Sequence, residues 1–135
     1  MKNKKLKYFL AVSFFVLIAY ILYDSFSQPN TNDLKGNFKE AALYRNENNT
    51  GPITRIYAVT VDGTPWEEMQ QYGDMMPYTK YGTTTVFFFS SNQPVPQKLT
   101  PGKVNFENKF NIHCLGKYLK DANGQVSFKQ FPFKP

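Results

Sequence analysis

The chain has 135 residues, a formal net charge of +6, a single cysteine and an aromatic content of 17%, which supplies enough large side chains for one hydrophobic core. Four of its sixteen Lys and Arg residues precede the first apolar run; from residue 28 onward, twelve Lys or Arg are scattered among nine Asp or Glu. Because nucleic-acid binding requires a concentrated cationic surface, this distribution argues against that function. Cys114 alone cannot form an intramolecular disulfide.

Residues 1–26 have the pattern of a signal anchor. The segment KYFLAVSFFVLIAYILYDSF occupies residues 7–26 and begins with the last of the four lysines, after which the apolar run follows. As a helix, residues 6–26 span about 32 Å, close to the ~30 Å hydrocarbon core of a bilayer. We therefore expect these residues to contact the lipid bilayer, with the N-terminus in the cytoplasm and the C-terminal domain outside the membrane. The alternative is a cleaved signal peptide and a secreted protein, because Ser25 and Ser27 have the spacing of a cleavage site.

The next segments predict a linker and the start of the domain. Residues 27–37, SQPNTNDLKGN, have the composition of a polar linker, so an exported domain is expected over residues 38–135. Residues 38–46 are compatible with a strand or a short helix. Turn formers and a glycosylation triplet, Asn48-Asn49-Thr50, then precede ITRIYAVTV, residues 53–61, whose β-branched and aromatic side chains predict a strand.

A helix is predicted within DGTPWEEMQQYGDMMP, residues 62–77. Thr64 and Glu67 have the spacing of a capping box, and Pro65 would occupy the first helical position. Apolar residues follow at intervals of three and four positions, namely Trp66, Met69, Tyr72 and Met76. Pro77 is expected to end the helix.

The C-terminal half predicts three more strands. GTTTVFFFSS, residues 82–91, is apolar on both faces, as in a central strand covered on each side. Residues 92–105 contain three prolines and predict a surface loop, and residues 106–113 a short helix. CLGKYL and QVSFKQF flank Asn123-Gly124, which predicts a hairpin with positive φ angles at its turn. The order of elements predicts an α+β domain: a mostly antiparallel sheet with one or two short helices on one face.

No catalytic site, metal site or cofactor is predicted. His113 and Cys114 are neighbours, and adjacent residues of a strand point to opposite faces, which does not suit a nucleophile and its base. A cuprous site built from these two residues and Met69, Met75 and Met76 is a chemical alternative. A single histidine and the lack of a repeated Met spacing argue against it. We therefore expect no enzyme activity.

The segment YGDMMPYTKYG, residues 72–82, is the predicted partner-binding region. It gathers side chains typical of protein interfaces: Tyr72, Met75, Met76, Tyr78 and Tyr81. The alternative interpretation places Tyr72 and Met76 in the core, with Tyr78 and Tyr81 over a sheet edge.

As a whole, the sequence predicts a single-pass, membrane-anchored protein that presents a small non-catalytic extracytoplasmic domain to a protein partner in the bacterial envelope. The alternative is a secreted or tethered protein that binds a small ligand or a metal. An apolar pocket containing Tyr72, Met75 or Tyr81 would favour the ligand, and a flat exposed patch would favour the partner.

Overall fold

The computed structural model describes residues 3–27, 31–46 and 51–134, so the predicted glycosylation triplet and most of the turn before the second strand lie outside the described residues. The chain divides into two compact units, Met1–Asn30 and Thr31–Pro135. The first contains α1 (Lys4–Ser27), whose side chains are exposed from Lys4 to Ser25. These 22 residues are long and apolar enough to cross a membrane. The predicted apolar N-terminal helix is confirmed, and it is compatible with a membrane anchor or a signal sequence.

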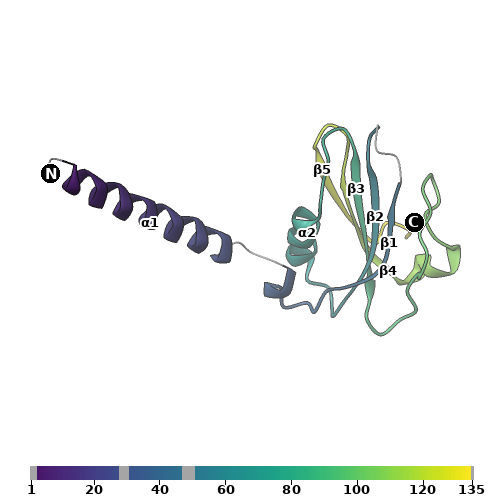
Figure 1. Cartoon of the computed structure of the whole chain (residues 1–135). Helices are drawn as coiled ribbons and strands as arrows, with labels where there is room; N and C mark the ends of the chain where they lie inside the picture. Colours follow the sequence, from purple (N-terminus) through teal and green to yellow (C-terminus); the bar gives the residue numbers. More distant parts are fainter. Residues whose placement is uncertain (1–2, 28–30, 47–50, 135) are drawn as a thin grey trace. The chain divides into compact units, whose positions relative to one another are not determined.

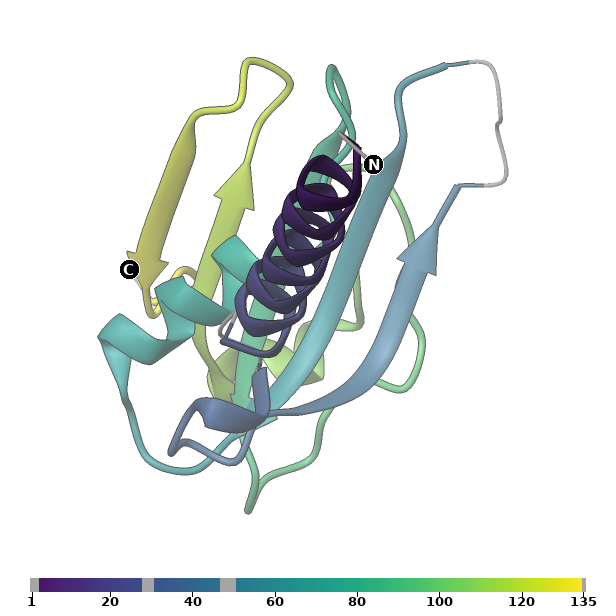
Figure 2. The same ribbon diagram turned by 60° about the vertical axis from the view of Figure 1, so that its left-hand side comes forward.

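The second unit is built on a five-stranded sheet in the order β1-β2-β3-β4-β5 (Figure 2). Its strands are β1 (Lys39–Arg45), β2 (Thr54–Val61), β3 (Thr83–Ser90), β4 (Cys114–Lys120) and β5 (Val126–Gln130). β2 and β3 are parallel and are joined through α2 (Trp66–Met75), whereas the other neighbouring pairs are antiparallel. The predicted α+β fold with a mostly antiparallel sheet is confirmed, and residues 39–45 form a strand.

The central strand β3 is covered on both faces, as predicted. Val86 and Phe88 contribute to one core cluster, and Phe87 and Phe89 to another. All four residues are at most 1% exposed. Because side chains alternate along a strand, these two sets point to opposite sides of the sheet.

The helix α2 covers one of these faces (Figure 1). Met69 and Tyr72 are buried against it, in agreement with the predicted apolar stripe. Gly73 allows the closest approach, because a Cβ at this position would lie 2.3 Å from Cγ of Tyr118 on β4. We call this side of the sheet the helix face.

The predicted capping box does not form. Pro65 is the residue that precedes the helix, α2 begins at Trp66, and no side chain caps the N-terminus. Instead, the carboxylate of Glu68 accepts hydrogen bonds from the backbone N–H groups of Lys35 and Gly36, both at 3.0 Å. The carboxylate of Glu68, in the first turn of α2, therefore binds the backbone of the segment that leads into β1.

Part of the predicted linker lies against the folded unit. A short 3-10 helix, η1 (Thr31–Asp33), leads to Leu34, which packs against the helix-face core. The backbone carbonyl of Gly36 accepts a hydrogen bond from Asp62 N at 2.8 Å. Phe38 stacks on Tyr72 with their ring centroids 5.0 Å apart. The described residues 31–37 thus belong to the compact unit.

The opposite face is covered by residues 91–113, which end in a 3-10 helix, η2 (Asn108–His113) (Figure 1). Leu99 and Phe106 are buried there, and Phe110 packs against the same cluster. The predicted short helix is confirmed, but the expectation that both helices share one face is wrong, because η2 and α2 pack on opposite sides. We call this side the loop face.

The predicted C-terminal hairpin is confirmed, with a different turn. Gly124 has a φ of +79°, whereas Asn123 has no positive φ. The side chain of Asp121 accepts hydrogen bonds from the backbone N–H groups of Asn123 and Gln125. Asp121 therefore replaces Asn123 as the residue that organises the turn, as aspartate often does at this position.

Candidate functional site

The structure separates the five residues predicted to bind a partner. Tyr72 is 5% exposed and belongs to the core, and Met76 packs against the same cluster. Met75 and Tyr78 are half-buried. Tyr81 is 65% exposed. Burial of Tyr72 removes it from any surface, so the five side chains do not form one patch.

Half-buried Tyr78 and exposed Tyr81 lie at the end of the sheet where β2 and β3 begin. The hydroxyl of Tyr78 donates to the carbonyl of Asp121 at 2.7 Å, and Lys120 Nζ lies 4.4 Å from the Tyr78 ring centroid. Tyr81 adopts a φ of +69°, uncommon for a bulky residue, and its ring lies 5.1 Å from Lys80 Nζ. The connection is therefore held in place, and a binding role for its exposed tyrosine stays a prediction.

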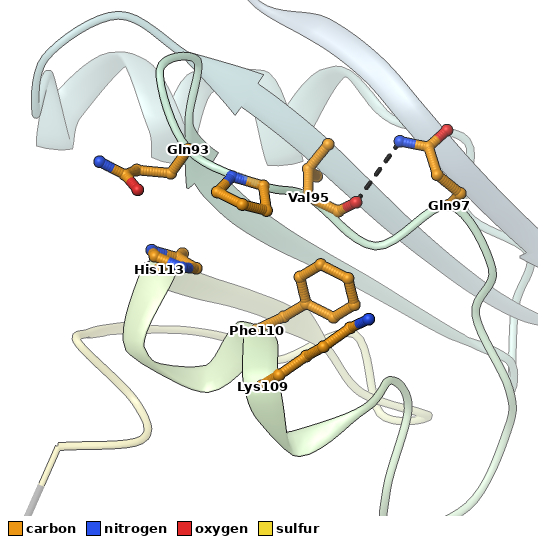
Figure 3. Close-up of a pocket in the computed structure, with 7 residues that line it drawn as sticks. Gln93, Val95, Gln97, Lys109, Phe110 and His113 are labelled. Carbon is orange, nitrogen blue, oxygen red and sulfur yellow. Dashed lines mark hydrogen bonds between the residues drawn. The ribbon is translucent and has the colours of Figure 1, made fainter.

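The largest cavity described lies elsewhere, on the loop face. We call it the His113 pocket; its volume is about 600 Å³ and it opens to solvent. One wall comes from the proline-rich segment after β3 and the other from η2 (Figure 3). It is lined by Gln93, Pro94, Val95, Gln97, Lys109, Phe110 and His113.

The His113 pocket has apolar walls and a polar rim. Phe110 points toward Val95 across the pocket, and the Gln97 side chain donates to the Val95 carbonyl at 3.4 Å (Figure 3). Lys109 Nζ lies 5.1 Å from the Phe110 ring centroid. It also pairs with Glu107 at 3.5 Å, but both side chains are at least 66% exposed, so this ion pair adds little stability. Such a pocket suits an apolar group flanked by hydrogen-bonding atoms.

His113 and Cys114 point into different surroundings. His113 lines the open pocket, whereas Cys114 is 3% exposed and its thiol lies 3.5 Å from the Gly116 carbonyl. Burial raises the pKa of the Cys114 thiol from 9.0 to about 12, so the thiol stays protonated well into the alkaline range. Cys114 is therefore a small buried apolar residue of the loop-face core.

The alternative cuprous ligands are also kept apart. Met69 belongs to the helix-face core, whereas Cys114 belongs to the loop-face core. Within the described ranges, no group of three or more His, Cys, Asp or Glu side chains is placed to hold a metal ion.

Sequence reasoning missed the His113 pocket because its two walls are about fifteen residues apart in the chain and meet only through packing on the sheet. One local signal was present: Phe110 and His113 are three residues apart, and side chains at this interval lie on the same side of a 3-10 helix.

Comparisons with family models, with curated proteins and with solved structures found no match to this chain.

Proposed function

We propose that the chain is a single-pass membrane protein that keeps α1 as its anchor and presents the unit from Thr31 onward outside the membrane. The support is the apolar span Lys4–Ser25, whose side chains are exposed on every side. A helix of this kind needs an apolar environment. The lysines at its start favour a cytoplasmic N-terminus.

The anchor is tested by expressing the full chain with a C-terminal tag and measuring its intact mass and its extraction by carbonate. The full mass in a carbonate-resistant fraction is expected. A soluble product that begins near residue 28 would instead indicate a cleaved signal peptide.

The proposed role of the exported unit is non-catalytic binding of a protein partner, and the His113 pocket is the observation that carries this proposal. Its apolar walls formed by Val95 and Phe110 fit a large apolar side chain, and it is open enough to admit one from another protein. Beside it, Ile112 is 77% exposed, which extends the apolar surface beyond the pocket. Tethering would raise the effective concentration of the domain near partners in the envelope.

The pocket is tested with a photo-cross-linking amino acid at Gln97, which lines it, and at Lys129 on β5 as a control. The full-length protein is expected to give a discrete adduct from position 97 only. Ile112→Glu should reduce its yield about tenfold, because a charge then borders the apolar contact, whereas Val126→Glu on β5 should not. Equal adducts from both positions, or an adduct insensitive to Ile112→Glu, would overturn the proposal.

A further inference from the structure

A second cavity lies on the other side of η2, and its lining differs in character from that of the His113 pocket. We call it the Lys117 cavity; its volume is about 220 Å³. Drug-sized ligands occupy pockets of about 300–1,000 Å³, so this cavity suits a single ring-sized unit. It lies between β3, β4, the end of the proline-rich segment and the C-terminal residues.

The 3-10 geometry of η2 separates the two sites. In such a helix, side chains three residues apart lie on the same side. Asn108 and Asn111 therefore share one side of η2 and line the Lys117 cavity, whereas Phe110 and His113 share another and line the His113 pocket.

The polar groups of the Lys117 cavity are available for a ligand. The side-chain amides of Asn108 and Asn111 make no hydrogen bond within the described part of the chain, whereas the amide of Asn105 is occupied by two backbone carbonyls. Lys103 and Lys117 also line the cavity, and neither forms an ion pair with a described residue. The described lining includes no Asp or Glu, so the cavity is cationic.

An aromatic wall completes the cavity. Phe87 packs against Phe106 with ring centroids 5.0 Å apart, and Phe133 lies 5.5 Å from Phe106. Lys117 Nζ is held 5.6 Å from the centroid of the Phe87 ring. Phe87 is 1% and Phe106 7% exposed, so the ring surface that the cavity offers is that of Phe133, which is 42% exposed, and the ammonium and amide groups lie beside it.

We infer that the Lys117 cavity binds an anionic saccharide unit, with a sugar ring against Phe133. The carboxylate or phosphate of that unit pairs with Lys117 and Lys103, and its hydroxyl groups exchange hydrogen bonds with Asn108 and Asn111. An amide side chain both donates and accepts, as a sugar hydroxyl requires. Lysine supplies a compact positive charge for the anion. This site is independent of the partner proposed for the His113 pocket.

The test is isothermal titration of the full chain in detergent micelles with four probes: glucuronic acid, glucose 6-phosphate, neutral glucose and inorganic phosphate. One or both sugar anions should bind at least tenfold more tightly than glucose and than phosphate alone, since a charged group and a ring are both recognised. Which of the two binds distinguishes a carboxylate ligand from a phosphate ligand.

Single substitutions test whether the preferred probe binds in the Lys117 cavity. Lys117→Gln and Asn111→Asp should each weaken the binding of the preferred probe about tenfold, whereas Lys80→Gln, an exposed lysine in the connection before β3, should not. Thermal unfolding of each variant controls for folding; Asn111→Asp is the second test because the Asn111 amide has no described partner. Equal affinity for glucose and the anions, binding of inorganic phosphate alone, no binding at about 10 mM, or full affinity in both variants would overturn the inference.

Discussion

The two faces of the sheet are covered by different kinds of chain. On the helix face, the regular helix α2 buries Met69 and Tyr72 and brings its backbone at Gly73 against the Tyr118 ring. On the loop face, a proline-rich segment and a 3-10 helix leave cavities of about 600 and 220 Å³. Regular helices pack to near-crystalline density, whereas an irregular segment leaves gaps between its contacts. We infer that the helix face mainly stabilises the domain, while the loop face is free to bind.

Truncating one large core residue on each face should give the largest difference in unfolding free energy between the two faces. Phe88→Ala removes a fully buried ring that contacts Phe38 and Tyr72, and it should cost about 3–5 kcal/mol of unfolding free energy. Phe106→Ala should cost less, because Phe106 already borders a cavity and loses fewer contacts. Denaturation followed by Trp66 fluorescence measures both; an equal or larger loss for Phe106→Ala would contradict the comparison.

A single methyl group added to α2 should test how tightly the helix face is packed. Gly73→Ala places a Cβ against the buried Tyr118 ring, and this overpacking should lower the unfolding free energy by about 1–3 kcal/mol. Gln70→Ala, at an exposed position of the same helix, is the matched control and should change it by less than about 0.5 kcal/mol. If Gly73→Ala is neutral or stabilising, the close approach is not a constraint on this face.

The unfolding free energy should fall at alkaline pH, and a different titrating group should contribute to this fall on each face. Burial raises the pKa of Tyr72 from 10.0 to about 12 and that of Cys114 from 9.0 to about 12. In both cases the folded state retains the proton, so the stabilising contribution is complete below the unfolded pKa and is lost as the pH rises toward 12. Cys114→Ala should remove the decline that begins near pH 9. Tyr72→Phe should remove only a part of the decline that begins near pH 10, because burial also raises the pKa of Tyr57 and Tyr118.

The measurement is the unfolding free energy at several pH values from neutral to alkaline. Glu67→Gln, at an exposed position of α2, provides a control for general changes in net charge. An unchanged pH profile in both test variants would show that neither buried group controls alkaline stability.

The last prediction concerns the reactivity of the Cys114 thiol toward an alkylating reagent. Since Cys114 lies under the loop-face cover with a raised thiol pKa, iodoacetamide should label it about a hundredfold more slowly in the native protein than in denaturant. Labelling is followed by intact mass at neutral pH. Nearly equal rates would mean that the loop face opens readily in solution.

The sequence predicted the elements that depend on local periodicity, but not the features that depend on tertiary contacts. The segment dense in β-branched and aromatic side chains became β2, the segment apolar on both faces became β3, and the stripe of Met69 and Tyr72 became the buried side of α2. The spacing of Thr64 and Glu67 suggested a cap; the helix instead starts after Pro65, and the neighbouring Glu68 binds the backbone of residues 35 and 36. That partner is distant in sequence, so no local pattern could reveal it.

The candidate site was harder to predict for the same reason. A cluster of Met and Tyr residues at 72–81 resembled a surface patch, but α2 turns Tyr72 into the core. The cavities instead depend on the packing of residues 93–113 on the loop face. Composition showed that this segment was a loop, but it carried no information on which side of the sheet the loop would cover.

The order of the strands has a consequence for how the domain folds. Because it follows the order of the chain, every ladder joins strands that are consecutive in sequence. The β1–β2 and β4–β5 hairpins close short loops and lose little loop-closure entropy, whereas paired residues of β2 and β3 lie 29 positions apart and close a longer loop. The first hairpin and the β2-α2-β3 unit can therefore assemble while the C-terminal residues are still being synthesised. Phe133, which closes the aromatic cluster with Phe87 and Phe106, would be among the last to dock.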